Sequence, residues 1–282
     1  MHRDRGISTV FDVLLFLLIV SAAIGLLVTG YSEESEQPTM ETASDVVTIL
    51  STSTETIVYT PDHSTVNTTD IDTRSDYGTV AHLLATAAVL EAEKSGEEIA
   101  ATPAYTQAVT EATKGATAPV EDRVQVRAIW EPVPDGSVKG EVIVGDSPPP
   151  DKDVQAASIS IPVATTDTPE QAEKSTQALS TVLAQATIES LFDTHRTKTA
   201  MESSHDEAEI SIARYQDAAT TLDTDLSIAL EQEDNSLARS ILVGALEEEY
   251  RRDIVRNPDS VSDISDKAAP TEVTIVVRTW SA

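Results

Sequence analysis

Two histidines with nearby carboxylates are the clearest candidates for metal chemistry in this sequence. His195 and His205 flank the segment RTKTAMESS, and Glu202 and Asp206 lie beside them. Imidazole and carboxylate groups are zinc ligands. On a continuous helix, however, a spacing of ten residues turns the two imidazoles about 80° apart. We therefore interpret the pair as two polar residues on an exposed helix or at a helix break.

Carboxylates are too frequent in this chain for any one pair to mark a catalytic site. The 282 residues contain 48 Asp and Glu, which could supply glycosidase acids or calcium ligands. The sequence has no calcium-loop pattern with a central glycine and no Walker, Rossmann, HExxH or GxSxG motif. It also has no cysteine, which excludes disulfides and thiolate chemistry. The sequence therefore predicts that the protein is not an enzyme and has no cofactor; an anchored hydrolase is the least favoured alternative.

The acidic charge of −29 belongs to the part of the chain after the first thirty residues. In that opening part Arg3 and Arg5 balance Asp4 and Asp12, so the excess falls on residues 31–282. At molar salt the Debye length falls to about 3 Å, and neighbouring carboxylates stop repelling one another over most of the surface. The composition resembles that of proteins from extreme halophiles, particularly haloarchaea.

Intrinsic disorder is the competing interpretation of this composition, because high charge and few aromatic residues also favour it. The hydrophobic share of 40% and the periodic segments described below argue against disorder of the whole chain. The acidic surface also argues against nucleic-acid binding, because phosphate affinity comes mainly from Lys and Arg.

An apolar segment near the N-terminus is long enough to cross a membrane. From Ile7 to Gly30 the sequence contains one charged residue, Asp12. A helix of this length extends about 36 Å, whereas the hydrocarbon core of a membrane is about 30 Å thick. Basic residues precede the segment and acidic residues follow it, which places the N-terminus in the cytoplasm and the C-terminal part outside. A cleaved secretory signal is the alternative, but its apolar core would be shorter. We expect a retained anchor in the lipid membrane.

The junction RGISTV, residues 5–10, followed at once by an apolar helix, resembles the class III signal of archaeal type IV pilins and pilin-like proteins. The resemblance covers about 25 residues. It implies a cut between Gly6 and Ile7, with the apolar helix kept on the mature protein for contacts with other pilin-like subunits. Proline follows the serine in many haloarchaeal pilins, whereas Thr9 stands here. The large domain favours a minor, tip or accessory component, of the Tad-like type, over a major pilin.

Asp12 has two interpretations. The resemblance implies that its carboxylate pairs with the new amino terminus of a neighbouring subunit and orients that subunit for assembly. Alternatively, Asp12 faces water or headgroups at the cytoplasmic interface, where a carboxylate in a membrane helix costs less than at the centre. Asn67 begins the glycosylation sequon NTT in a turn-rich stretch that we place on the outside.

The remainder of the chain predicts an α+β domain with an antiparallel sheet and several helices. We expect a hairpin of Asp45–Leu50 with Glu55–Thr60, and three strands that form a meander. A late strand, EVTIVVRTW, docks into the same sheet, because it is too apolar for an exposed edge. Tyr77, His82, Trp130 and Trp280 are expected to be packing residues. The three meander strands are Arg123–Glu131, Ser137–Val144 and Val154–Val163.

Apolar residues at helical spacing predict five helices grouped on one side of the sheet. The first is capped by Ser75 or Asp76. They are expected at Tyr77–Glu93, Thr102–Lys114 and Thr168–Thr199, and around the stripes 215–230 and 242–254.

These observations predict four parts of the chain: a leader (1–6), a transmembrane helix (7–30), a linker (31–44) and an extracellular domain (45–282). We expect a single-pass envelope protein, pilin-like or pilus-associated, that acts by assembly or adhesion. The main alternative is an anchored extracellular binding protein.

Overall fold

The predicted leader and transmembrane helix, residues 1–30, lie outside the part of the chain that the structure describes. Among the described helices, none has both the length and the hydropathy of a membrane span. The computed structural model describes residues 40–61, 73–121, 123–163, 175–192, 205–232, 234–257, 259, 261–268 and 271–281.

A six-stranded antiparallel sheet forms the centre of the fold, with the strand order β4-β3-β6-β5-β8-β7. Buried and exposed side chains alternate along β6. Val138, Val142 and Val144 are buried, while Lys139 and Glu141 face solvent. On the solvent face, ion pairs join Lys139 to Glu93 and Arg127 to Glu141. The strands are β3 (Ala92–Lys94), β4 (Glu97–Glu98), β5 (Arg123–Trp130), β6 (Val138–Val144), β7 (Gln155–Pro162) and β8 (Glu272–Trp280).

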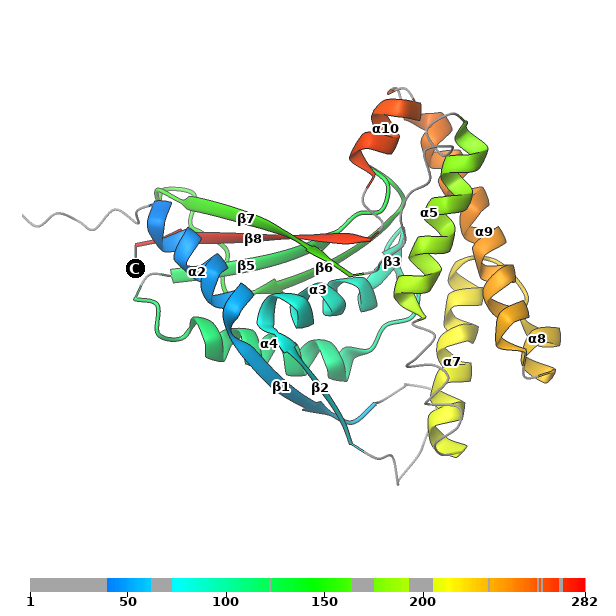
Figure 1. The fold of residues 1–282 in the computed structure, drawn as a ribbon, viewed down its shortest axis with the longest axis horizontal. Coiled ribbons are helices and arrows are strands. Elements are labelled where there is room, and N and C mark those ends of the chain that lie inside the picture. Colours follow the sequence, from blue (N-terminus) through cyan, green and yellow to red (C-terminus); the bar gives the residue numbers. More distant parts are fainter. Residues whose placement is uncertain are drawn as a thin grey trace, which may run out of the picture.

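Three helices, α2 (Met40–Thr52), α3 (Val80–Leu90) and α4 (Pro103–Thr117), lie below the buried face of this sheet in the view of Figure 1. Helix α3 is buried on nearly all sides because it lies between the sheet and α4. Its alanines allow this close packing, and Thr79 caps it by accepting the His82 N–H at 3.2 Å.

Gly140 marks the closest approach between β6 and α3. A Cβ atom at this position would lie 2.0 Å from the backbone oxygen of Ala88. Glycine is therefore required here by contact between two backbones, because any side chain would separate the helix from the sheet.

A two-stranded antiparallel ribbon, β1 (Thr54–Tyr59) with β2 (Arg74–Thr79), packs against α4. Its inner face is held by Tyr59, whose ring meets Tyr105 of α4 edge-on at 5.2 Å between centroids. The Tyr105 hydroxyl donates to the Asp76 carboxylate at 3.1 Å. The ribbon thus adds a third layer beyond α4, with its other face turned outward.

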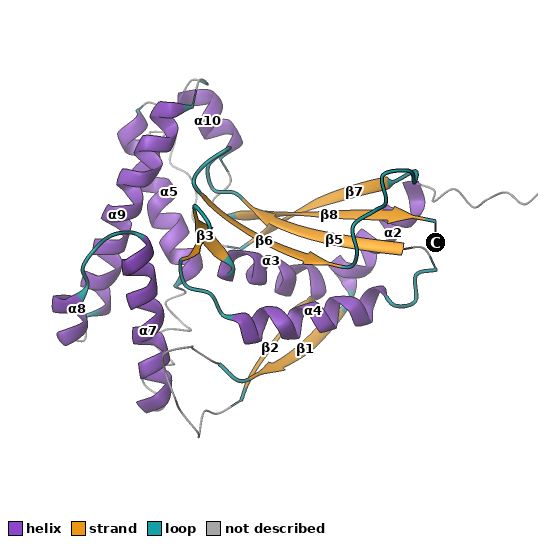
Figure 2. Cartoon of the chain, turned by 180° about the vertical axis from the view of Figure 1, so that it is seen from behind, coloured by secondary structure: helices purple, strands orange, loops and turns teal. Residues whose placement is uncertain are grey.

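The remaining helices gather at the end of the sheet where β3 lies, as Figure 2 shows from behind. We call them the helical unit, and the six-stranded sheet with α2, α3, α4 and the ribbon the sheet unit. Within the helical unit α5 packs along α9, and α7 and α8 also contact α9. Its members are α5 (Thr176–Leu191), α7 (His205–Thr221), α8 (Ser227–Glu231), α9 (Asn235–Arg256) and α10 (Val261–Lys267).

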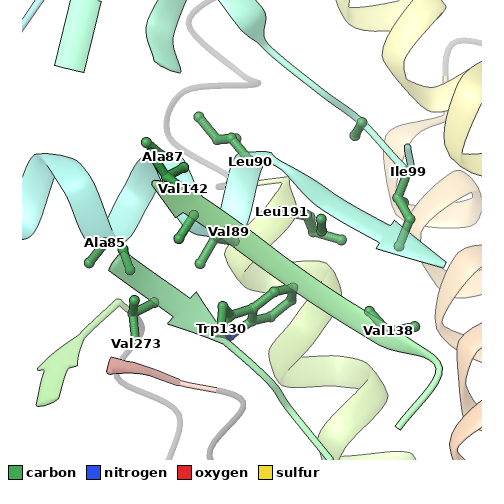
Figure 3. Close-up of a cluster of buried hydrophobic side chains, with 14 of the residues drawn as sticks. Ala85, Ala87, Val89, Leu90, Ile99, Trp130, Val138, Val142, Leu191 and Val273 are labelled. Atoms are coloured by element: carbon green, nitrogen blue, oxygen red, sulfur yellow. The ribbon is translucent and has the colours of Figure 1, made fainter. Parts of the chain in front are cut away.

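A continuous hydrophobic core joins the two units. Figure 3 shows the Trp130 side chain of β5 in one cluster with Leu191 of α5 and Leu90 of α3. Trp130 is fully buried, and burial of an aromatic ring of this size removes roughly 150–250 Å² from water. Trp130 therefore links the sheet unit to the helical unit by apolar contact.

The α+β architecture and most of the predicted elements are confirmed. Helix α4, strands β5 to β7 and the buried position of the late strand agree with the sequence analysis, since β8 pairs with β5 on one side and β7 on the other. The predicted meander is wrong for β7. This strand does not lie beside β5 or β6, because β8 lies between β5 and β7. The helices also do not all lie on one side of the sheet, because the helical unit packs at its end.

The predicted hairpin of Asp45–Leu50 with Glu55–Thr60 is also wrong. Residues 45–50 belong to α2, and β1 pairs instead with β2. Ala43, Val46 and Leu50 are fully buried at helical spacing and α2 packs against β7 and β8, so burial outweighs the strand preference of the β-branched run. Helix α2 begins at Met40, so the folded domain extends into the predicted linker 31–44.

Candidate functional site

Among the described residues, the most buried acidic side chains lie at the seam between the sheet unit and α9. Glu249 and Asp253 lie one helical turn apart on the inward face of α9 and are 7% and 9% exposed. Lys94, at the end of β3, reaches them from the sheet. We call Lys94, Ser137, Glu249, Arg252 and Asp253 the seam cluster.

Ser137 is the centre of the seam cluster. It follows a turn in which Asp135 adopts a positive φ of 55° and Gly136 donates its N–H to the Val133 carbonyl at 2.9 Å. This turn presents both the backbone N–H and the hydroxyl of Ser137 to Asp253 Oδ2, at 2.9 and 2.7 Å. The Ser137 hydroxyl also lies 3.3 Å from Glu249 Oε1.

Two cations of the cluster pair with Glu249, and outside the cluster Arg256 Nη1 lies 3.8 Å from Asp253 Oδ1. Arg252 Nη1 lies 2.9 Å from Glu249 Oε2, and Lys94 Nζ lies 3.7 Å from the same oxygen. Lys94 also donates to the Thr221 carbonyl at the end of α7, at 2.9 Å. The carboxylates of α9 are therefore compensated by hydrogen bonds and by charge, as burial of an ionised group requires.

The seam cluster favours a structural role over a catalytic one. The Ser137 hydroxyl donates to a carboxylate, and the described residues of the cluster include no histidine that could accept its proton as a general base. No group of His, Cys, Asp and Glu side chains within the described residues has the arrangement of a metal site. We interpret the cluster as a polar clamp that holds α9 and α7 against the end of the sheet.

A second polar attachment lies in the middle of α7. Arg214 donates to the Ala100 carbonyl at 3.1 Å and to the Leu191 carbonyl at 3.3 Å. Its guanidinium lies 5.6 Å from the centroid of the Phe192 ring, which is stacked on Tyr215. One arginine thus connects three segments: the loop before α4, the end of α5, and α7.

Two tyrosines in the helical unit are held in their neutral form. Burial raises the pKa of Tyr250, whose hydroxyl shares a hydrogen bond of 2.9 Å with the Thr187 hydroxyl. Burial also raises the pKa of Tyr215, against the opposing effect of the Arg239 and Arg214 charges. Neither side chain reaches solvent, so both act in packing.

The residues singled out by the sequence analysis are mostly not brought together. Gly6, Ile7, Asp12 and Asn67 lie outside the described residues, as do His195 and Glu202. His205 begins α7, but its side chain and that of Asp206 are not described. The histidine pair is therefore not tested as a metal site.

Two of the four expected packing residues pack as predicted. Trp130 and Trp280 are buried. Tyr77 is 68% exposed and His82 is also exposed, so the prediction is wrong for both. Tyr77 belongs to β2 instead of the predicted helix, which begins after Thr79, and the expected caps Ser75 and Asp76 likewise lie in the strand.

Sequence reasoning missed the seam cluster. The available signal was Glu249, which falls in the apolar stripe of α9 and so predicts a buried carboxylate in need of partners. Lys94 and Ser137 are 155 and 112 residues away from it along the chain. Their position next to Glu249 follows from the pairing of β3 with β6 and could not be read from the sequence.

Comparison with known proteins gives one match. The model of a family of unknown function, DUF7284, matches residues 11–280. No curated protein and no solved structure matches the chain. The matched range contains most of the apolar N-terminal segment together with every described helix and strand.

Proposed function

Because the chain belongs to the family of unknown function DUF7284, we propose a function from its own sequence and fold. The protein is a single-pass, membrane-anchored, pilin-like component of a haloarchaeal cell envelope, and it acts by assembly or adhesion. Its N-terminus lies in the cytoplasm and its acidic α+β domain lies outside the cell. This function places the apolar segment 7–30 in the lipid membrane, in contact with other pilin-like subunits.

The continuity of the apolar segment with the folded domain carries this proposal. Ten residues after Gly30 the chain enters α2, whose Ala43, Val46 and Leu50 are fully buried in the core. Nine residues, 31–39, thus separate the proposed anchor from a helix of the domain core. The family match spans residues 11–280 and so includes most of the apolar segment as well as the folded domain.

The charge distribution supports an outside location in concentrated salt. Residues 31–282 carry the whole net charge of −29, while the apolar segment contains one carboxylate, Asp12. Carboxylates remain hydrated at molar salt while their mutual repulsion is screened.

Mass spectrometry of the mature N-terminus tests the processing step. The full chain is expressed in a haloarchaeal host that exports and processes its own pilins, and the protein is recovered from the envelope. We expect a mature chain that begins at Ile7. An intact Met1 or His2 end, or a terminus near residue 24, would contradict prepilin-type processing.

Substitution of Asp12 tests the assembly step. Asp12→Ala should leave membrane insertion intact and reduce incorporation into high-mass envelope complexes, measured by native gel electrophoresis of detergent extracts. Asp45→Ala is the matched control, because Asp45 is an exposed carboxylate on α2. Equal incorporation of both variants would remove the assembly role from Asp12.

A further inference from the structure

We infer that the outer edge of β1 is an interface at which two copies of this chain pair antiparallel. This inference rests on the proposed assembly role and names its partner, a second copy, and the strand that binds it. Residues 54–59 pair with β2 on one side, and no hydrogen bond from the described residues reaches their other side.

The register of the ribbon indicates which residues of β1 point outward. Tyr77 faces Thr56 across the ribbon, yet it donates its backbone N–H to the Asp76 carboxylate at 2.9 Å. In an antiparallel pair, residues that do not bond across the ladder turn their N–H and C=O to the opposite edge. Thr54, Thr56 and Val58 therefore present their backbone groups at the outer edge of β1.

The two margins of the six-stranded sheet are protected against edge-to-edge pairing, whereas no backbone hydrogen bond among the described residues reaches the outer edge of β1. At one margin of the six-stranded sheet, β4 is two residues long, acidic and bonded through the Glu98 carbonyl to Thr221 of α7. At the other margin, β7 packs against α2 and ends in Pro162. Short strands, charges, proline and covering elements are the usual means of preventing edge-to-edge association. β1 carries one charge, Glu55, and lies at the margin of the molecule in Figures 1 and 2.

The exposed face of the ribbon also suits contact with a second acidic chain. The side chains of Thr54, Thr56 and Val58 are exposed, as is that of Tyr77 opposite them. Val58 is 61% exposed, and the four side chains carry no charge. On a chain with a net charge of −29, such a face lets two copies approach with little local repulsion.

The choice of register follows from Glu55 and from the outward residues Thr54, Thr56 and Val58, because only an axis at Thr56 pairs all three with outward residues of the second copy. If the two-fold axis passes at Thr56, Thr56 faces its own copy, Thr54 faces Val58 of the second copy, and Glu55 faces Ile57. An axis at Glu55 would instead place the two carboxylates directly opposite each other, which is unfavourable. We therefore place the axis at Thr56. This pairing joins two ribbons into one four-stranded sheet with identical surfaces in contact.

Single-cysteine cross-linking tests this contact, because the natural chain has no cysteine. Opposed strand positions have a Cα separation of about 4.5–5.5 Å, within the range of a disulfide. Under oxidation in molar salt, the full chain in detergent with Thr56→Cys should form a covalent dimer with itself. Thr54→Cys and Val58→Cys should cross-link to each other in a mixture. The control is Ser158→Cys, an exposed position on β7.

We expect about tenfold more covalent dimer from Thr56→Cys than from Ser158→Cys, since a disulfide requires close Cβ positions. A second pair of variants tests the backbone contact without a new thiol. Thr56→Pro removes an outward N–H and should abolish the dimer in light scattering, whereas Thr56→Ala keeps that N–H and the dimer. Dimers that survive Thr56→Pro would overturn the inference.

Three further outcomes separate this inference from the proposed function. Equal cross-linking of Thr56→Cys and Ser158→Cys, or cross-links only to a different protein, would overturn the β1 contact between copies. In a second outcome, the cysteine variants form no covalent dimer, but their incorporation into envelope complexes is still reduced by Asp12→Ala. This result would overturn the β1 contact and leave the proposed function in place. Specific cross-links in a chain that keeps Met1 would support the β1 contact and contradict prepilin-type processing.

Discussion

The sheet unit and the helical unit are built around different kinds of contact. Within the sheet unit, α3 lies between the sheet and α4 with nine of its eleven residues buried, and the packing is almost entirely apolar. The helical unit meets the sheet through an apolar contact at Trp130 and through the polar seam cluster around Ser137. Close packing therefore defines the sheet unit, whereas the placement of the helical unit also depends on hydrogen bonds and ion pairs between specific groups.

Gly140→Ala, in the sheet unit, should lower the free energy of unfolding more than any other substitution considered for either unit. The added Cβ would lie 2.0 Å from the Ala88 carbonyl oxygen, so α3 must move away from β6, at about 3 kcal/mol or more of unfolding free energy. Chemical denaturation of the full chain at molar salt measures this loss. Gly244→Ala on α9 is the control, because a Cβ there meets no atom within 4 Å and should stabilise the helix by about 1 kcal/mol. A neutral Gly140→Ala would show that the two layers tolerate separation.

Asp253→Ala should have the next largest effect, and it should act on the helical unit. It removes the acceptor of both the N–H and the hydroxyl of Ser137, and leaving these buried donors without their charged acceptor costs about 3 kcal/mol. Limited proteolysis should then cleave the helical unit before the sheet unit. The exposed Glu248, paired with Arg251 on the same helix, supplies the control: Glu248→Ala should unfold close to the wild-type midpoint. Simultaneous cleavage of both units would contradict the role of the seam cluster.

Tyr250→Phe should reveal a dependence of stability on alkaline pH in the helical unit. Burial raises the pKa of Tyr250 above its ordinary value of 10.0, so the folded state keeps the phenol neutral while the unfolded state ionises above that value. The contribution of Tyr250 is therefore complete below pH 10 and declines above it, by about 1.4 kcal/mol per pH unit. Below pH 10 the variant should lose about 1 kcal/mol with the Thr187 hydrogen bond.

The measurement for this prediction compares unfolding free energies of the wild type and Tyr250→Phe at pH 8, 10 and 11. Groups other than Tyr250 cancel in the difference between the two proteins. The difference in unfolding free energy should shrink as the pH rises, because only the wild type has a phenol at position 250 that ionises when the chain unfolds. A constant difference over this range would show that Tyr250 is not held neutral by burial.

The helix caps should have the smallest effect and should not distinguish the two units. Thr79 caps α3 in the sheet unit, and Asp234 caps α9 by accepting the Leu237 N–H at 3.0 Å. Replacement of either residue by alanine should cost about 1 kcal/mol, because each cap satisfies one local N–H group. Thermal unfolding of the two variants checks this. A cost several times larger in one unit would show that its cap also supports tertiary contacts.

Local patterns in the sequence predicted the elements whose burial follows a simple period. The alternation in β5, β6 and β7 and the near-continuous apolar run of β8 were sufficient, because each strand packs on the sheet face that its own pattern defines. Helix α2 was misread as a strand, although Ala43, Val46 and Leu50 have helical spacing. Its Thr48 and Ser51 hydroxyls bond to carbonyls four residues earlier, so the hydroxyl and β-branched residues that suggested a strand are accommodated in a helix.

The sequence by itself determined the α+β class, the acidic surface, the absence of thiol chemistry and a candidate membrane segment, because these depend on composition and on local periodicity. Only the tertiary structure decided that β8 separates β5 from β7 and that Ser137 meets Asp253. It also decided that the outer edge of β1 is uncovered within the described part of the chain. Each of these depends on pairings between distant segments, and such pairings are selected by the free energy of the whole packed chain.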